Sequence, residues 1–229
     1  MGRFINADVF ASTGQGFLGC NMFAYCNNNP VNFKDSCGAV PTCCVMLHDG
    51  AGGGKPITEV FSSFSELTIS VGPSTVAIDA YLVFEGDIDS EALIQGIKDY
   101  WEGDYYFQTG TKKVTINIHC GTTSDGRAIY VNSVDGNGRG HTYPAFRDGG
   151  VSKVTIYSKY ESGNKQNIGW EMAHEFGHCL GIDDYYTLLN KGIVSTDLCS
   201  IMNRTATHAQ SWDICMAIWA SQYGEWQKW

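Results

Sequence analysis

The stretch HEFGHCLGIDD, residues 174–184, constrains the folding of this chain more than any other part of it. His174 and His178 are four residues apart, so on a helix both imidazoles project from the same face, one turn from each other. Adjacent turns of one helix can hold two imidazole nitrogens at the distance of about 2.0–2.1 Å that a zinc ion requires. The stretch therefore predicts a helix, from about 168 to 180, that carries two ligands of a metal site.

The remaining polar residues and the glycine of this stretch complete the predicted site. Glu175 points about 100° away from His174 on a helix, so it can act as a general base toward a water instead of binding the metal. Gly181 stands where the helix ends and where the backbone often needs a positive φ. A turn there would bring the chain back beneath the metal and place Asp184 as the third ligand, with Asp183 as the alternative.

HEFGHCLGIDD matches the extended motif HExxHxxGxx(H/D), and CSIMNR follows at 199–204. In both stretches the chain resembles the metzincin zinc peptidases, in the variant whose third ligand is an aspartate. The resemblance implies a zinc-dependent endopeptidase in which His174, His178 and Asp184 bind Zn²⁺ and Glu175 activates a water. It also implies that Met202 is the methionine of a Met-turn, an apolar floor below the metal.

Further residues near the motif are candidates for substrate contacts. Some metzincins carry a tyrosine two residues after the Met-turn methionine, and this chain has Arg204 there. Tyr185, Tyr186 and His208 are therefore considered for contact with a substrate. The remaining histidines, which are interpreted as structural or surface residues, are His48, His119 and His141.

The pattern of apolar residues predicts an α+β fold. Strands are expected at 75–84, 113–120, 127–134 and 151–160, a short edge strand at 140–146, and helices at 90–101 and 211–222 besides the one with the histidines. This order fits the metzincin resemblance, which implies a mixed, mostly parallel five-stranded sheet, an active-site helix, a Met-turn and a C-terminal helix. The resemblance also implies that an extended peptide substrate lies along 140–146.

Composition and charge exclude several classes of protein. The chain has 229 residues, 43% hydrophobic, enough for one packed domain with an appendage. A formal net charge of -9 disfavours binding to nucleic acid, and with it a nuclease activity. No apolar run approaches the roughly 20 residues of a membrane span, and the first residues lack the pattern of a signal peptide. There are nine cysteines, among which Cys179 and Cys199 are a candidate disulfide pair.

Residues 2–38 contain GRFINAD, STGQG, NMFAYCNNNPVN and a closing DSCG. In these features the segment resembles the end of an Rhs repeat-associated core, with Ser36 where that family usually has proline. The resemblance implies a core-like tail at 1–45, a linker at 46–73 and a metallopeptidase domain at 74–229. Such a chain would be the payload of a bacterial polymorphic toxin, with an upstream Rhs shell and an immunity protein as partners. It would be secreted or delivered to a target cell, and would otherwise be cytoplasmic.

Two alternatives stay open at this stage. In the first, the chain is a non-catalytic Rhs-associated binding or attachment module, and His208 or a cysteine closes a structural zinc site as fourth ligand. In the second, the peptidase is kept latent because the thiolate of Cys37 reaches the zinc.

Overall fold

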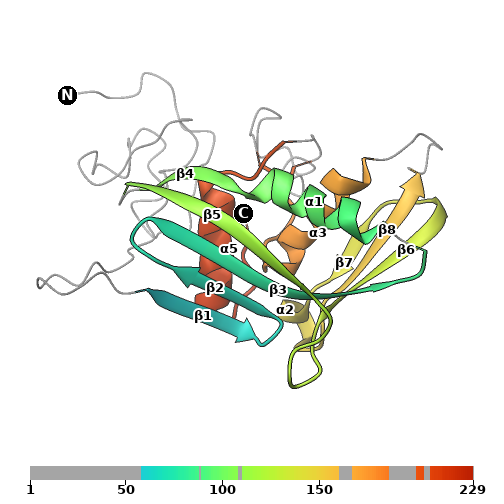
Figure 1. Cartoon of the computed structure of the whole chain (residues 1–229), viewed down its shortest axis with the longest axis horizontal. Helices are drawn as coiled ribbons and strands as arrows, with labels where there is room; N and C mark the ends of the chain where they lie inside the picture. Colours follow the sequence, from blue (N-terminus) through green and yellow to red (C-terminus); the bar gives the residue numbers. More distant parts are fainter. Residues whose placement is uncertain are drawn as a thin grey trace, which may run out of the picture.

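The protein is described from a computed structural model, which covers residues 58–87, 89–107, 110–159, 167–185, 200–203 and 207–228. Within these ranges the chain forms an α+β fold around one mixed sheet, as the sequence predicts (Figure 1). The elements in chain order are β1 (Glu59–Phe64), β2 (Leu67–Val71), β3 (Thr75–Glu85), α1 (Ser90–Trp101), β4 (Gly103–Phe107), β5 (Gly110–Cys120), β6 (Ile129–Asn137), β7 (His141–Tyr143), α2 (Ala145–Asp148), β8 (Lys153–Lys159), α3 (Ile168–Cys179) and α5 (Ser211–Tyr223).

The sheet is built around the long strand β3. Strands β2 and β6 share one edge of β3, because Ala80 pairs with Leu67 of β2 while Leu82 pairs with Ile129 of β6. Strand β5 occupies the other edge, where Leu82 also pairs with Cys120. The full order is β1-β2-β3-β6-β8-β7, with β4 pairing on β5.

The expectation of a mostly parallel, five-stranded sheet is wrong. The described residues form an eight-stranded sheet. Three neighbouring pairs in it are parallel (β3–β5, β3–β6 and β6–β8), and four are antiparallel (β1–β2, β2–β3, β4–β5 and β7–β8). The five expected strands are present as β3, β5, β6, β7 and β8, and β1, β2 and β4 extend the sheet. The predicted edge strand is confirmed, since β7 pairs with β8 at the end of the strand order.

The expected linker at 46–73 is wrong in its second part, because β1 and β2 lie there and belong to the sheet. In β2, the side chains of Leu67, Ile69 and Val71 alternate along the strand and are buried, which makes β2 part of the core. The folded domain therefore begins before residue 74. The Rhs-like segment with Cys37 lies outside the described residues, as does His48 in the expected linker, and the roles predicted for them stay predictions.

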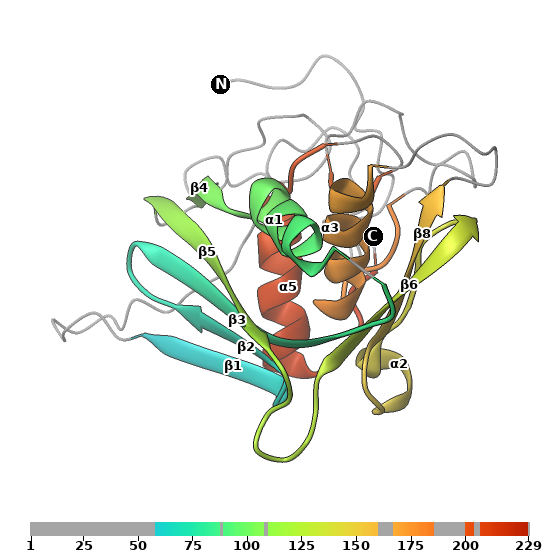
Figure 2. The ribbon, with the colours of Figure 1, turned by 45° about the vertical axis from the view of Figure 1, so that its right-hand side comes forward.

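The three long helices α1, α3 and α5 all lie on one face of the sheet (Figures 1 and 2). Helices α1 and α3 approach each other closely at Gly96 and Gly169, where a Cβ on Gly96 would lie 2.3 Å from the Cα of Gly169. The indole N–H of Trp101 on α1 donates to the backbone carbonyl of Ala173 on α3, at 2.8 Å. Helix α3 is thus fixed along its length against α1.

The described cysteines change one prediction. Cys179 is buried and free, which excludes the candidate pair of Cys179 with Cys199. Cys215 on α5 is disulfide-bonded. Since Cys120 is free as well, the partner of Cys215 lies outside the described residues. Among the helices of the described ranges, none is long and apolar enough to cross a membrane.

Candidate metal centre

Helix α3 forms where the sequence predicts it and is buried over most of its surface. It begins after Asn167, whose side-chain oxygen accepts a hydrogen bond from the N–H of Trp170 at 3.1 Å. Gly177 faces the buried side chain of Met202, and a Cβ on Gly177 would lie 2.3 Å from its sulfur atom. The glycine therefore lets Met202 pack directly against the helix, next to His178. The expected role of Met202 as an apolar floor below the metal stays a prediction.

The two histidines of α3 have their imidazoles fixed by backbone carbonyls. The Nδ1 atom of His174 lies 2.8 Å from the carbonyl oxygen of Ile201, and that of His178 lies 2.8 Å from the carbonyl oxygen of Ile182. A carbonyl can only accept, so Nδ1 carries the proton in both rings and donates it. In the neutral imidazole Nε2 then has a free lone pair, which is the arrangement that metal-binding histidines usually show.

The turn at Gly181 directs the chain from α3 toward the histidines. Gly181 has a φ of +91°, and a Cβ there would lie 2.6 Å from the Cβ of Ala220 on α5. The next residues are held by the C-terminal segment, because Gln227 donates to the carbonyl of Gly181 (2.7 Å) and accepts from the N–H of Asp183 (2.9 Å). Asp184 follows directly after this paired segment.

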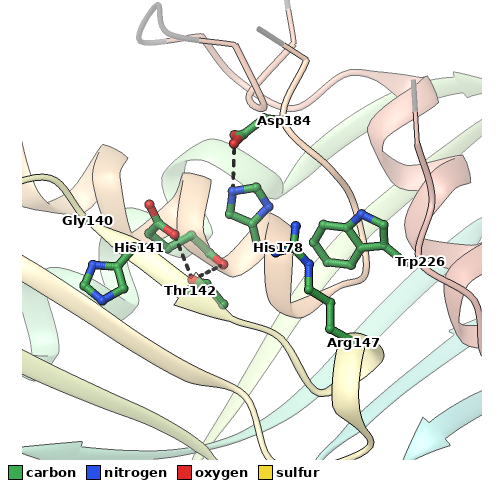
Figure 3. Close-up of a pocket in the computed structure, with 8 residues that line it drawn as sticks. Gly140, His141, Thr142, Arg147, His178, Asp184 and Trp226 are labelled. Atoms are coloured by element: carbon green, nitrogen blue, oxygen red, sulfur yellow. Dashed lines mark hydrogen bonds and ion pairs between the residues drawn. The ribbon is translucent and has the colours of Figure 1, made fainter. Parts of the chain in front are cut away.

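The carboxylate of Asp184 lies close to both histidines, and Figure 3 shows its contact with His178. Its Oδ1 atom lies 3.3 Å from Nε2 of His174 and 3.2 Å from Nε2 of His178. Ligands around a tetrahedral zinc ion with bonds of about 2.1 Å are separated by about 3.4 Å. Oδ1 is buried and accepts no well-aligned hydrogen bond from the described residues. The ligand atoms of the three residues lie within 4.8 Å of one another, so their spacing and donor types are compatible with one metal ion such as zinc, and they are the three candidate ligands named from the sequence.

The charges of the three residues support one another. Burial acts to raise the pKa of Asp184, but the two neighbouring imidazoles lower it by more, so the carboxylate is ionised. Burial acts to lower the pKa of His174, but its contact with Asp184 and the charge of Glu175 outweigh this effect and raise the pKa to about 9. An anionic ligand and an extra carboxylate therefore make this buried position favourable for a cation.

Glu175 is next to the three candidate ligands but is held by a different element. Its side chain is buried, and its Oε2 atom accepts a hydrogen bond from the hydroxyl of Thr142 at 2.7 Å. Thr142 lies on the edge strand β7, which is also tied to α3 because the N–H of Gly140 donates to Glu171 at 2.8 Å. The carboxylate of Glu175 is thereby kept beside the ligands with one oxygen atom engaged.

A pocket of about 160 Å³ opens beside these residues. Its lining residues come from β7, α2, α3, the Gly181 turn and the C-terminal segment; they are Gly140, His141, Thr142, Arg147, Glu175, His178, Asp184 and Trp226. His141, which the sequence predicts as a structural or surface histidine, is exposed and also lines the pocket. Thr142, Arg147 and Trp226 were missed, although the predicted edge strand at 140–146 pointed to the region of the first two.

Trp226 forms one wall of the pocket. Its ring stacks on the imidazole of His178, with centroids 5.9 Å apart and an angle of 20° between the planes. No local signal in the sequence pairs a tryptophan near the end of the chain with this histidine.

Two of the candidate substrate contacts lie elsewhere. Tyr185 is fully buried, its N–H donates to the carbonyl of Met202 at 2.9 Å, and it does not line the pocket. His208 is exposed and lies against the ring of Tyr100, with centroids 4.9 Å apart, away from the pocket lining. The expectation for Tyr185 is therefore corrected, whereas that for His208 stays a prediction. Tyr186 lies outside the described residues.

The turn that contains Met202 is anchored to α5. The N–H of Met202 donates to the hydroxyl oxygen of Ser200 (3.0 Å), and this hydroxyl donates to the buried carboxylate of Asp213 (2.7 Å). The other oxygen of Asp213 accepts from the N–H of Gln210 at 2.7 Å. Burial raises the pKa of Asp213 to about 7, against the opposing effect of these hydrogen bonds. The carbonyl of Ile201 that orients His174 is thus held through α5.

A scan of protein-family models finds none that matches the chain, and a search of curated proteins finds no match either. A function for the chain is therefore inferred from the residues of the site.

Proposed function

We propose that the chain is a zinc-dependent endopeptidase of the metzincin type. The observation that carries this proposal is the convergence of His174, His178 and Asp184 on one point, with the carboxylate of Glu175 beside them in an open pocket. Two imidazoles and one carboxylate are a ligand set that catalytic zinc sites use, with a fourth position left for water or substrate.

Each residue has a distinct role in this proposal. A zinc ion bound at this site would polarise the scissile carbonyl and lower the pKa of a water. Glu175 takes a proton from the attacking water and later passes it to the leaving amine. The hydrogen bond from Thr142 holds one oxygen of Glu175, so the other oxygen is oriented for this transfer. Asp184 adds a negative charge, which makes the metal a weaker Lewis acid than three neutral histidines would.

The arrangement favours a catalytic over a structural zinc. A structural site needs a fourth protein ligand. Among the described residues, the group that could hold a metal consists of His174, His178 and Asp184, without a cysteine or His208. The alternative of a non-catalytic attachment module with a closed zinc site therefore has no support from the described part of the chain.

The edge strand β7 is the proposed place for the substrate. It pairs with β8 on one side, and Thr142 faces Glu175 from it. Among the described residues no strand pairs with the other edge of β7, and a peptide in extended conformation could add there through main-chain hydrogen bonds, which require little sequence preference. We further propose that the peptidase is the payload of an Rhs toxin, a part of the proposal that rests on residues 2–38 alone.

The decisive experiment compares the wild type with Glu175→Gln, which has nearly the same shape and cannot act as a base. We expect one zinc per chain in both, and loss of peptide-library cleavage by about 10²- to 10⁴-fold in the variant. Glu91→Gln makes the same chemical change at an exposed site on α1 and should keep full activity. Full activity of Glu175→Gln would refute the mechanism, and its loss of zinc would make Glu175 a ligand instead.

A further inference from the structure

Arg147 is the cationic side chain at one end of the pocket. It lies on the short helix α2, which follows the edge strand β7 directly, and its side chain is 62% exposed. Its guanidinium carbon lies 4.9 Å from the centre of the Trp226 ring. In Figure 3 the two side chains lie together on one side of His178, with His141 on the opposite side.

The backbone around Arg147 is firmly placed. The N–H of Ala145 donates to the hydroxyl of Ser152 at 3.0 Å. The neighbouring ring of Phe146 packs edge-on against Phe64, with centroids 5.0 Å apart. Arg147 therefore extends toward the pocket from a helix whose neighbouring residues are anchored to the rest of the fold.

The guanidinium of Arg147 is available to an incoming anion. Its contact with Asp183 is 4.0 Å long, well beyond the roughly 2.7–2.9 Å of a charge-assisted hydrogen bond. When a guanidinium stacks on an aromatic ring, its plane lies parallel to the ring and its N–H groups point outward. These N–H groups can then form two hydrogen bonds with one carboxylate. The carboxylates that line the pocket are already engaged, Glu175 by Thr142 and Asp184 by the two histidines.

We propose that Arg147 and Trp226 form a subsite for a carboxylate of the substrate, so that the enzyme prefers peptides with an acidic group near the scissile bond. Trp226 supplies the platform that orients the guanidinium, and Arg147 supplies the charge and the paired donors. The net charge of the chain is -9, so this preference is local to the pocket and does not follow from the overall field. The inference rests on the proposed peptidase activity.

The test uses one cleavable peptide in which Asp, Asn, Ala or Lys is placed in turn at each position next to the cleaved bond. We expect the wild type to cleave the best Asp peptide with a kcat/KM about three- to tenfold above that of its Asn twin, as for a partly exposed ion pair. Arg147→Ala should abolish this ratio, and Arg147→Glu should invert it in favour of Lys. The readout for each variant is the ratio of kcat/KM for the Asp peptide to that for its Asn twin, which separates the charge preference from any change in the overall rate.

Arg139→Glu is the matched control, because Arg139 is an exposed arginine just before the pocket residue Gly140 but does not line the pocket. This variant should keep the preference for Asp. Each peptide is also made with a free and an amidated C-terminus. If peptides with a free C-terminus are cleaved better than the amidated ones and this difference depends on Arg147, the subsite binds the C-terminal carboxylate of the substrate peptide.

The outcomes separate the subsite from the peptidase activity. Cleavage without a preference for Asp, or a preference that persists in Arg147→Ala, overturns the subsite and leaves the proposed function intact. An equal loss for Asp and Asn peptides in Arg147→Ala also overturns it, since Arg147 would then serve only the fold. If no peptide is cleaved by the zinc-loaded wild type, the proposed function itself fails.

Discussion

Gly181 joins the helix of the two histidines to the segment that carries Asp184, and its replacement by alanine would strain this connection in two ways. An L-residue at a φ of +91° costs about 1–2 kcal/mol. The new Cβ would also lie 2.6 Å from the Cβ of Ala220 and 3.1 Å from the ring of Phe146, and such overpacking costs about 1–3 kcal/mol. Together we expect Gly181→Ala to lower the free energy of unfolding by about 2–5 kcal/mol.

The same strain should reach the metal site. The backbone of Gly181 and Asp183 pairs with Gln227, so relief of the clash moves the segment that ends in Asp184. A displaced third ligand should weaken zinc binding by about 10- to 100-fold. Urea unfolding of the metal-free protein measures the first effect, and competition with a chromophoric chelator measures the second.

Gly126→Ala is the matched control for this substitution. Gly126 has a φ of +80°, and no atom lies within 4 Å of the position that a Cβ would take there. Gly126→Ala therefore has the conformational cost of an L-residue at positive φ but no steric clash. We expect a loss of about 1–2 kcal/mol and unchanged zinc affinity. If Gly181→Ala costs no more than Gly126→Ala, the packing argument fails. If it is destabilised but binds zinc as the wild type does, Gly181 is not coupled to the site.

Two further predictions concern hydrogen bonds at the site. Thr142→Val removes the hydrogen-bond donor to Glu175 at nearly constant shape, so peptide cleavage should fall about tenfold with zinc content unchanged. Thr142→Ser keeps the hydroxyl and should stay close to the wild type. Equal activity of the wild type and both variants would show that this hydrogen bond does not orient the base. For Asp213, the unfolded chain ionises near the ordinary pKa of 3.8, whereas the folded chain holds the proton up to about pH 7. The contribution of Asp213 to stability therefore decreases as pH rises from 3.8 to about 7 and is constant above. The urea midpoint of the metal-free protein, measured from pH 4 to 8, should lose this part of its pH dependence in Asp213→Asn; an unchanged profile would assign the dependence to another group.

The sequence predicted the helices well because their signals are local. Asp89 caps the start of α1 by accepting from the N–H of Ala92, and Asn167 caps α3 in the same way. Apolar residues at helical spacing then mark the buried faces. The strands β1 and β2 were missed because serine and threonine alternate there with the apolar residues, and hydroxyl-rich stretches resemble loops. Their place in the sheet is decided by pairing with β3, which is a tertiary property.

The convergence of the three candidate ligands could be predicted for a related reason. The spacing of His174 and His178 is a property of one helix turn, and the turn at Gly181 determines where Asp184 follows. The remainder of the pocket depends on contacts between distant segments. Trp226 reaches His178 only because the C-terminal segment pairs with the residues after Gly181. No spacing of residues in the sequence predicts that pairing.

In the proposed enzyme, different parts of the fold would position the metal ligands and the groups that act on the substrate, so mutations in the two parts should have different effects. The orienting carbonyl of Ile201 lies in the turn that α5 anchors through Asp213. The carboxylate of Glu175 and the cation of Arg147 are positioned instead from β7 and α2. Changes at the α5 side should therefore act first on zinc affinity, whereas changes at the β7 side should act on kcat/KM with zinc still bound. The two groups of variants can be told apart by measuring metal content and cleavage on the same samples.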